Sequence, residues 1–299
     1  MTVIDIEYLI NDAKLADAAQ GALDHQDDIG SATASPIRPV HKGFKEFVAG
    51  DSFGVSEVAI VTILQALALD RPILFLPLTA LGRYQHQTLI STRELSVQDL
   101  AGKTVGVRSW SQTTGMWVRG ILAHQYDVDV RASKWRTYGG GHLTEIADPD
   151  WVDRAEPGSK LADDLLGGVV DFAVMGNDRP DDPSVRDVIP DAKNTAAAWA
   201  AEAGFIPVNH VFGAREDVAR EHSGAVLAVY DAIAATLEER QTGGGPIMEP
   251  VGFAALRPAF TAAATYAWEQ DLLPRKVDYD ELVERTASAL GVTAERLGG

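Results

Sequence analysis

Cysteine is absent from the 299-residue chain. Disulfides, thiolate metal sites, iron–sulfur clusters and cysteine nucleophiles are therefore excluded. Basic residues are scarce, because 26 Lys and Arg stand against 43 Asp and Glu, which gives a net charge of −17. A charge of this sign repels a phosphate backbone, so we expect no nucleic-acid partner. An anionic small molecule is still compatible with it, since local basic groups can override the overall sign.

Long apolar runs are also missing. No stretch of about 18 apolar residues is present, so we expect no membrane partner. The first 20 residues lack the basic segment and apolar core of a secretory leader, and we therefore expect a cytoplasmic protein, although a chain given without its leader would read the same way. Apolar residues make up 46% of the sequence, enough for a sizeable core. The length exceeds the roughly 100–200 residues of one typical domain.

Short apolar segments alternate along the chain with segments of helical spacing. Residues 4–9 predict a strand, and a helix capped by Asp12 follows it. Residues 24–39 are polar and predict a loop. The alternation as a whole predicts a largely parallel α/β architecture.

Two apolar strands, 87–91 and 205–213, are spaced so that each could carry the chain from one lobe to another. This pattern is typical of a two-lobe protein whose ligand lies in a cleft. We expect one discontinuous lobe of residues 1–88 plus 208–299, and a second lobe of residues 89–207.

Small polar residues fill the turn between an expected strand and an expected helix near residue 110. The first N–H groups of a helix have no partner within it, and the helix dipole is positive there. Ser109, Ser111, Thr113 and Thr114 add hydroxyls to this turn. Together these donors predict a cradle for a carboxylate. Ordinary N-capping is the alternative, and one Ser or Thr satisfies it.

The helix after this turn carries two further candidates for substrate binding. Thr113 and Trp117 are four residues apart and share a helix face, so Trp117 could form an aromatic wall beside the cradle. Plain core packing explains Trp117 equally well. Arg119 could contact the substrate, or it could form an ion pair at the surface or between the lobes.

Ser56 and Glu57, in "VSEVA", are expected at another turn from strand to helix, where open α/β sheets bind ligands. Ser56 is a candidate N-cap. A partly buried carboxyl at Glu57 could move a proton. The alternative is a first-turn glutamate that complements the helix dipole.

His86 and His210 each lie beside one of the expected crossing strands, with Asn209 next to the second. Both imidazoles could act as acid or base, or could bind a divalent metal together with Glu57 or Asp12. No local spacing of metal ligands is present, and a structural role is the alternative for each histidine. Loop residue Asn177 follows another strand and could also contact a ligand.

Seven segments occur in the order typical of the 4,5-dihydroxyphthalate decarboxylase family: "FGVSEVAIVTIL", "YQHQTLIS", "DLAGKTVGV", "TTGMWVRGIL", "GGVVDFAV", "IPVNHVFGAREDV" and "YAWEQDLLPRKVDYDELV". The chain resembles this family over nearly its whole length. The family is similar in fold to type-2 periplasmic binding proteins, which implies two α/β lobes with a ligand cleft between them. Where the family tends to have an Arg before His86, this chain has Gln85, with Arg83 two positions earlier. Arg83 and Asp12 are therefore candidates for substrate contact.

The resemblance implies a decarboxylase acting on a hydroxylated aromatic acid similar to 4,5-dihydroxyphthalate. Trp117 and the hydroxyl turn would orient the ring, and Glu57, His86 or His210 would deliver a proton. A ring hydroxyl would supply electrons, so no organic cofactor is expected, while a divalent metal is compatible with the residues. The alternative is a non-catalytic solute receptor or sensor for a small carboxylate. A different lyase or hydrolase acting on a related acid is a third hypothesis.

A late helical segment carries several large apolar residues: Tyr266, Trp268, Leu272 and Leu273. This segment could cover a homodimer contact, or it could pack within one lobe.

Overall fold

The computed structural model describes residues 3–243 and 245–299. The chain divides into two compact units, and each unit combines segments that are distant in the sequence. Unit 1 comprises Met1–Gly82, Val208–Ala262 and Arg275–Gly299, whereas unit 2 comprises Arg83–Pro207 and Ala263–Pro274.

This division differs from the expected lobes at two places. The first boundary falls after Gly82 rather than after residue 88, because strand β4 (Ile73–Gly82) ends there. Ala263–Pro274 belongs to unit 2, because helix α9 (Phe253–Glu269) begins in unit 1 and ends in unit 2. The expected strand 87–91 is short and lies within unit 2 as β5 (Leu89–Ser91).

Unit 1 is built on a five-stranded sheet in the order β2-β1-β3-β11-β4. The first three strands in this order are parallel, and β11 runs antiparallel to both of its neighbours. The strands other than β4 are β1 (Ile4–Leu9), β2 (Ile29–Ala34), β3 (Val55–Ala59) and β11 (Val208–Arg215).

The expectation of a loop over residues 24–39 is wrong, because β2 occupies part of that segment. Its sequence, IGSATA, is partly or fully exposed throughout and shows no apolar alternation. The parallel ladder with β1 holds this edge strand in place. Its pairing partner therefore decides its conformation, and local hydrophobicity does not.

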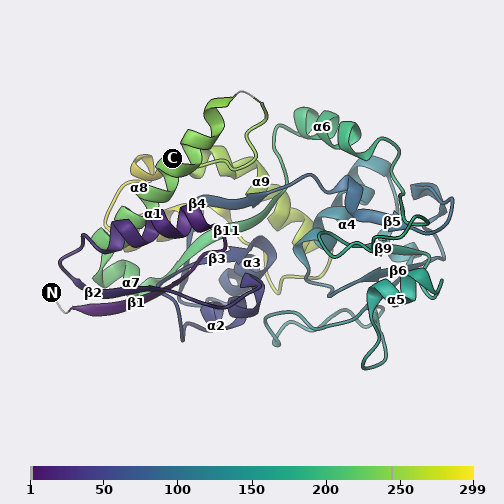
Figure 1. The fold of residues 1–299 in the computed structure, drawn as a ribbon, viewed down its shortest axis with the longest axis horizontal. Helices are drawn as coiled ribbons and strands as arrows, with labels where there is room; N and C mark the ends of the chain where they lie inside the picture. Colours follow the sequence, from purple (N-terminus) through teal and green to yellow (C-terminus); the bar gives the residue numbers. More distant parts are fainter. Residues whose placement is uncertain (1–2, 244) are drawn as a thin grey trace. The chain divides into compact units, whose positions relative to one another are not determined.

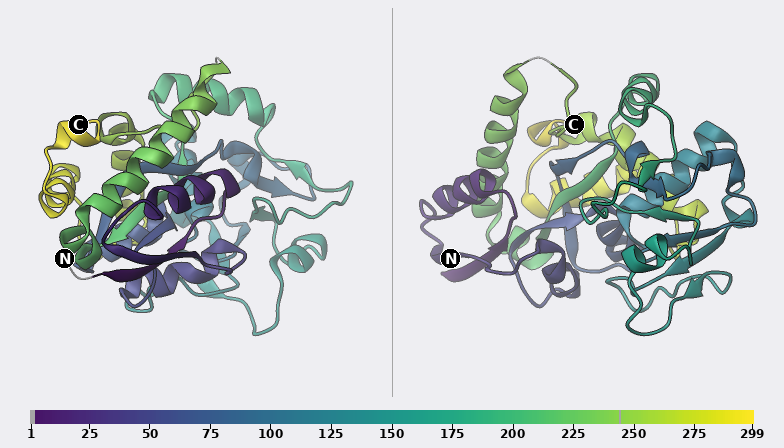
Figure 2. Two further views of the ribbon diagram at one scale, coloured as in Figure 1. Left: turned by 60° about the vertical axis from the view of Figure 1, so that its left-hand side comes forward. Right: turned by 45° about the vertical axis from the view of Figure 1, so that its right-hand side comes forward.

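The helices of unit 1 cover its sheet. Figures 1 and 2 show α1 lying side by side with α8, and these two helices are in contact. The α-helices other than α9 are α1 (Ala13–Leu23), α2 (Phe44–Ala49), α3 (Ile60–Ala68), α7 (Glu216–Glu221), α8 (Ser223–Arg240) and α10 (Tyr279–Leu290). Short 3-10 turns are η1 (Val40–Gly43), η5 (Gln241–Gly243) and η6 (Ala294–Leu297).

Unit 2 has a six-stranded sheet in the order β10-β5-β9-β6-β7-β8. Its central strands β9, β6 and β7 are parallel, so their carboxyl ends lie at one edge of the sheet. The strands other than β5 are β6 (Thr104–Val107), β7 (Lys134–Thr137), β8 (Asp153–Arg154), β9 (Phe172–Val174) and β10 (Arg186–Asp187).

The helices of unit 2 lie on both faces of this sheet. In Figure 1, α4 (Thr113–Tyr126) lies on one face and α5 (Leu161–Leu166) on the other. The remaining elements are α6 (Ala192–Ala203) and the 3-10 turns η2 (His86–Thr88), η3 (Val97–Asp99) and η4 (Val130–Ala132). Helices on both faces bury β6 and β9, which explains why these two strands are mostly apolar.

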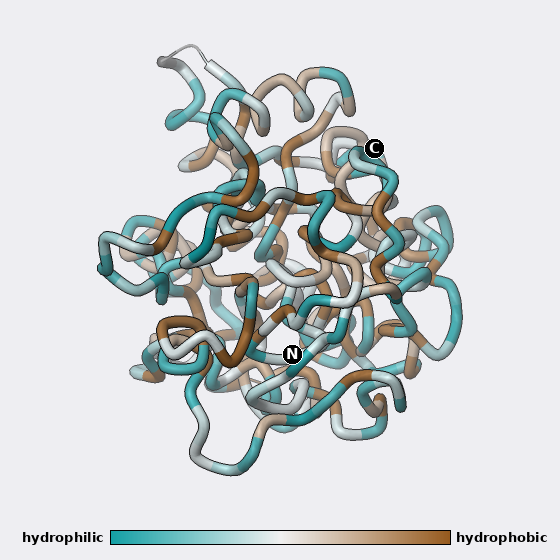
Figure 3. The backbone as a smooth tube through the Cα atoms, turned by 90° about the vertical axis from the view of Figure 1, so that its right-hand side faces the viewer, coloured by the Kyte–Doolittle hydropathy of each residue, from teal (hydrophilic) through white to brown (hydrophobic). Residues whose placement is uncertain are grey.

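The hydropathy of the residues follows the arrangement of sheets and helices in the two units. Figure 3 shows hydrophilic residues mainly in the peripheral loops of the chain. Among the described residues, none of the helices is both long enough and apolar enough to span a bilayer.

Candidate functional site

A carboxylate and an imidazole meet on the sheet of unit 1. β11 runs antiparallel to β3, with Glu57 opposite Phe212 and His210 opposite Ala59. Glu57 and His210 are therefore diagonal neighbours on the same face of the sheet. The Oε1 atom of Glu57 lies 2.6 Å from the Nδ1 atom of His210.

The second oxygen of Glu57 is also held. The backbone N–H of Asn11, in the chain leaving β1, donates to Oε2 at 2.8 Å. The Glu57 side chain is 5% exposed, so protein donors, not water, satisfy its oxygens. The His210 side chain is 20% exposed, and the edge of its ring meets Phe44 with the ring centroids 5.2 Å apart. The contact with Glu57 occupies the Nδ1 atom of His210, and the Nε2 atom is left to exchange a proton with a ligand.

The expectation that Ser56 caps a helix is wrong. Ser56 and Glu57 lie within the fully buried strand β3, and α3 begins only at Ile60, with Ala59 at its N-cap. The Ser56 hydroxyl is buried and donates to the carbonyl of Glu57 at 2.6 Å. Because β3 is a central strand packed on both faces, its apolar run continues into the helix without a local boundary.

Asp12 and Asn209 flank the pair on neighbouring elements. Asp12 caps α1, as predicted, and accepts from Leu15 N–H at 3.1 Å and from Arg240 Nη2 at 2.7 Å. Burial alone would raise the pKa of Asp12, but the hydrogen bonds from Arg240 and Leu15 lower it below its usual range. Asn209 is buried beside His210 on β11, at an irregularity in the pairing of β11 with β4.

The polar turn of unit 2 precedes α4 and lies at the carboxyl edge of the sheet. Gln112 occupies the N-cap position, and its side chain makes no capping hydrogen bond. Ser109, Thr113 and Thr114 are buried. Among the described residues, nothing partners the Oγ1 atom of buried Thr113. Simple capping therefore does not account for the Thr113 hydroxyl.

Ser111 is half-buried in the same turn and packs against the glycine-rich loop after β7. A Cβ atom on Gly141 would lie 2.5 Å from the Ser111 hydroxyl, so a larger residue there would displace that hydroxyl.

Arg83 and Asn177 meet at the end of β9. Arg83 Nη1 donates to Asn177 Oδ1 at 3.0 Å, while its Nε and Nη2 are buried and have no partner among the described residues. Burial lowers the pKa of Arg83, and Asp178 opposes this shift. A Cβ atom on Gly176 would lie 2.7 Å from Nη2, so the glycine makes room for the guanidinium.

The β-sheet register brings the Arg83–Asn177 contact and the polar turn to the same edge of unit 2. Val107 at the end of β6 pairs with Val174 at the end of β9. The turn at Ser109 and the loop at Asn177 therefore leave adjacent parallel strands at equivalent points. Buried polar atoms without partners call for an explanation such as a ligand or bound water. In unit 2 such atoms include donors on Arg83 and the hydroxyl of Thr113.

Trp117 and Arg119 are both fully buried. The Trp117 ring packs between Phe205 and Tyr266, with ring centroids 6.0 and 5.7 Å away. Arg119 donates to the Gln270 side chain and to the carbonyl of Trp110. Neither side chain offers a surface to a ligand in this structure, which favours the packing interpretation of Trp117.

His86 lies apart from the polar turn of unit 2. Its Nε2 contacts Gln125 Oε1 at 2.8 Å, and Gln125 lies twelve residues after Thr113, about 18 Å along α4. The ring is buried at 1% exposure and packs against Trp199, with the centroids 5.8 Å apart. Burial lowers the pKa of His86, although the Gln125 contact opposes the shift. The geometry is that of a neutral, packed histidine.

The expected metal ligands divide between the units, with His86 in unit 2 and Glu57 and His210 in unit 1. Over residues 3–243 and 245–299, no three His, Asp or Glu side chains gather in a group that could hold a metal ion. The helix end with Tyr266, Leu272 and Leu273 is buried within the chain, whereas Trp268 is 40% exposed.

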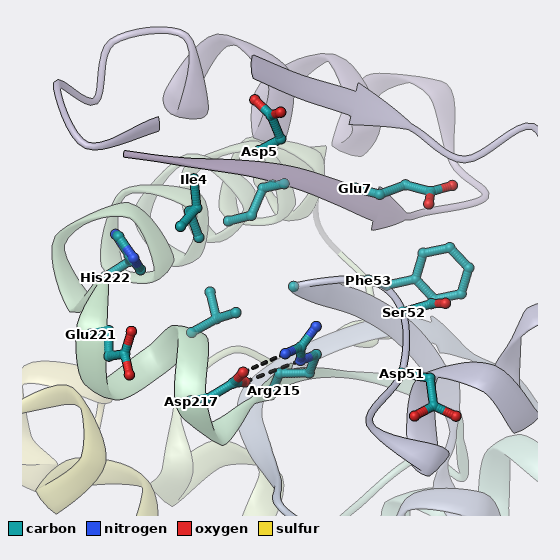
Figure 4. Close-up of a pocket in the computed structure, with 13 residues that line it drawn as sticks. Ile4, Asp5, Glu7, Asp51, Ser52, Phe53, Arg215, Asp217, Glu221 and His222 are labelled. Carbon is teal, nitrogen blue, oxygen red and sulfur yellow. Dashed lines mark hydrogen bonds and ion pairs between the residues drawn. The ribbon is translucent and has the colours of Figure 1, made fainter. Parts of the chain in front are cut away.

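A separate pocket of about 360 Å³ lies in unit 1, beside the amino-terminal half of β1 (Figure 4). Carboxylates dominate its lining, and Arg215 Nε donates to Asp217 Oδ1 at 3.0 Å. The acids that line the pocket are Asp5, Glu7, Asp51, Asp217 and Glu221. The lining includes none of the candidate residues predicted from the sequence.

Sequence reasoning missed the backbone donor at Asn11 and the aromatic neighbour Phe44. Phe44 stands in a short helix far from His210 in the sequence, so no local signal marks their contact. Asn11 directly precedes the predicted cap Asp12 and follows a strand end. Its position at the carboxyl end of β1 is the one signal that could have identified it.

Comparison with known proteins gives one sequence relative of named activity. No family model matches the chain. A 4,5-dihydroxyphthalate decarboxylase from Comamonas testosteroni is 24% identical over 207 residues, which cover 63% of this chain. The match spans 62% of that relative's length, which is less than two thirds.

Solved structures match over nearly the whole chain. The aliphatic sulphonate binding protein SsuA of Escherichia coli aligns with a TM-score of 0.56 at 16% identity, covering 94% of this chain and 97% of that one. The desulfurization enzyme DSZB aligns with a TM-score of 0.53 at 15% identity, covering 97% and 99%. A putative sulfonate-binding SsuA from Methylobacillus flagellatus gives 0.50 at 14% identity, covering 98% and 95%. The chain therefore has the two-sheet α/β fold of the SsuA-like periplasmic binding proteins, as predicted.

Proposed function

We propose that the protein is a carboxy-lyase that removes CO2 from a small hydroxylated aromatic acid, with His210 as the proton donor. The observation that carries the proposal is the contact between buried Glu57 and partly exposed His210, at 2.6 Å. A buried carboxylate that orients an accessible imidazole is an arrangement for acid–base chemistry, and passive binding does not require it. The relative named as a 4,5-dihydroxyphthalate decarboxylase supports the reaction class.

The contact sets the role of each nitrogen of His210. An ionised carboxylate only accepts hydrogen bonds, so Nδ1 donates to Glu57 and Nε2 exchanges the proton. The protonated ring delivers its Nε2 proton to the aromatic carbon that bears the carboxylate, and a C–H bond forms there. The bond to the carboxylate then breaks, its electron pair returns to the ring, and CO2 leaves. His210 is left neutral and regains a proton from water.

Glu57 stabilises the imidazolium form of His210 before the transfer. A hydroxyl on the substrate ring donates electron density to the protonated intermediate, so this route uses no organic cofactor. Asn11 N–H keeps the Glu57 carboxylate in place at 2.8 Å. The Phe44 ring restricts the orientation of the imidazole.

Within unit 2, we assign the binding of an anionic substrate group to the carboxyl edge of the sheet. Arg83 offers two buried donors that no described residue accepts from, and Thr113 offers a buried hydroxyl. The N–H groups of the first turn of α4 add a positive dipole. Ser109, Ser111, Thr114 and Asn177 complete the polar edge.

The test is CO2 release from a panel of hydroxylated benzoic and phthalic acids, with and without EDTA. We expect release from at least one ring-hydroxylated acid and its loss in His210→Ala. His124 supplies a matched control, because it contacts Glu269 at 2.7 Å but is 46% exposed in unit 2. Turnover by His124→Ala should equal that of the wild type. Absence of CO2 from every compound, or full turnover by His210→Ala, would overturn the proposal.

A non-catalytic binding protein is the second candidate. The buried donors of Arg83 favour it, because they could hold an anionic ligand without any reaction. Several structural neighbours carry names of sulfonate-binding proteins. A thermal shift with an aromatic sulfonate or carboxylate, without CO2 release from any acid, would select this function.

A further inference from the structure

Arg119 is a buried cation whose hydrogen-bond acceptors among the described residues are neutral groups. The residue is fully buried, and its guanidinium stacks over the Trp110 ring at 3.6 Å. Its Nε donates to Gln270 Oε1 at 2.7 Å, and its Nη2 donates to the Trp110 carbonyl at 2.6 Å. Both acceptors are neutral groups. Among the described residues, nothing accepts from Nη1.

The acid that acts on Arg119 from a distance is Asp148. Arg154 Nη2 already donates to the Asp148 carboxylate at 2.7 Å, so that negative charge has its own partner. Burial lowers the pKa of Arg119 well below its usual range, which expresses the cost of a desolvated charge. A buried cation normally has a paired anion.

The guanidinium lies against the start of α4. A Cβ atom on Gly115 would lie 3.0 Å from Nη1, and Gly115 is the third residue of the helix. The Trp110 carbonyl, which Nη2 holds, belongs to the polar turn before the helix. The charge of Arg119 therefore lies beside the positive end of the helix dipole. Two positive features at one point destabilise each other unless an anion joins them.

A second observation points to the same place. Thr113, the first residue of α4, is 6% exposed, and its hydroxyl has no partner among the described residues. A ligand oxygen at this turn would satisfy that hydroxyl, and the helix dipole is positive there.

We propose that Arg119 is a positioning residue whose buried charge selects an anionic group at the N-terminal turn of α4. The oxyanion of the ligand, a carboxylate or a sulfonate, is the counter-charge that the described part of the chain does not place at this turn. Arg119 does not touch it, but acts through the turn and through the local field. The inference deepens the proposed function, since it rests on an anion bound at this edge of unit 2.

The experiment measures binding by calorimetry, without turnover. The probes are benzoate, benzenesulfonate and neutral benzamide, none of which carries a ring hydroxyl. Arg119→Met removes the charge and Arg119→Lys keeps it. Gln270→Glu places a neutralising charge beside Nε, and it also removes the hydrogen bond that Gln270 Nε2 donates to the Met116 carbonyl, so binding of the neutral probe reports any structural damage. Arg131→Met is the matched control, because Arg131 also belongs to unit 2 but is 60% exposed in a pair with Asp271.

We expect Arg119→Met and Gln270→Glu to weaken binding of the preferred anion at least about tenfold, which corresponds to about 1.4 kcal/mol of binding free energy. Arg119→Lys should stay within about threefold of the wild type, and Arg131→Met within about twofold. Binding of benzamide should not change between the wild type and the variants. Whichever of benzoate and benzenesulfonate binds more tightly identifies the anionic group.

Three results would overturn the inference. The first is that Gln270→Glu binds the anion as tightly as the wild type does. The second is that the variants lose as much affinity for benzamide as for the anion. The third is that the wild-type chain binds neither benzoate nor benzenesulfonate. If Arg119→Met does not fold, Gln270→Glu decides, since it retains the arginine. A failed decarboxylase assay leaves these affinities unaffected, so the two proposals fail separately.

Discussion

Glu57 Oε1 and His210 Nδ1 lie 2.6 Å apart on neighbouring antiparallel strands of unit 1. Their positions are 153 residues apart in the sequence, and the register of β3 against β11 brings them to one face. The Asn11 N–H donates to Oε2 of Glu57, and the His210 imidazole contacts Oε1, so both carboxylate oxygens are held. The carboxylate can therefore fix the tautomer of His210.

Replacing Glu57 by Gln should lower turnover about 100-fold or more, with a smaller change in KM. The amide keeps the shape of the side chain, but it cannot stabilise a protonated imidazole as a carboxylate does. The rate of CO2 release measures the effect. Glu269→Gln is the control, since Glu269 lies 2.7 Å from exposed His124, and Glu57 lies 2.6 Å from His210. Equal rates for Glu57→Gln and the wild type would remove Glu57 from the mechanism.

Arg83→Met should weaken binding of an aromatic carboxylate about tenfold or more, because it removes two buried donors that have no partner in the described part of the chain. The ligand-free protein should lose little stability, since the guanidinium is desolvated and its side-chain partner is Asn177. Calorimetric titration and thermal unfolding measure the two effects. Arg186→Met, at an exposed arginine paired with Glu94, is the control.

His86 should make the protein less stable as the pH falls. Its folded-state pKa is lowered from 6.5 by burial, so the unfolded chain binds a proton first. The stability that neutral His86 contributes is therefore complete above pH 6.5 and is lost as the pH falls through the lower folded-state pKa. Urea midpoints measured from pH 7.5 down to about pH 4.5 should fall more steeply for the wild type than for His86→Gln. Parallel curves would contradict this role.

Trp117 should matter for folding and not for ligand contact. Trp117→Ala should reduce the free energy of unfolding by about 3–5 kcal/mol, because it empties a fully buried site between Phe205 and Tyr266. The milder Trp117→Phe should fold and bind an aromatic carboxylate within about twofold of the wild type. A selective loss of ligand affinity in Trp117→Phe, with normal stability, would favour the aromatic wall that the sequence also allows.

Local sequence signals identified the elements whose chemistry is local. Asp12 caps α1 as predicted, because the cap depends only on residues within one turn. The polar turn before α4 was found from the density of hydroxyls between strand and helix. The α/β class followed from the alternation of apolar segments. Local patterns failed for β2, whose conformation depends on pairing with β1.

The residue pattern was enough to specify the class of fold and the residue types available for acid–base chemistry and anion binding. Which of these residues meet depended on the folded arrangement of strands and helices. The register of β3 against β11 brings the side chains of Glu57 and His210 into contact. The packing of helices buries His86 and Arg119. The physical reason is that strand pairing and burial depend on partners far away in the chain, and no short-range pattern encodes those partners.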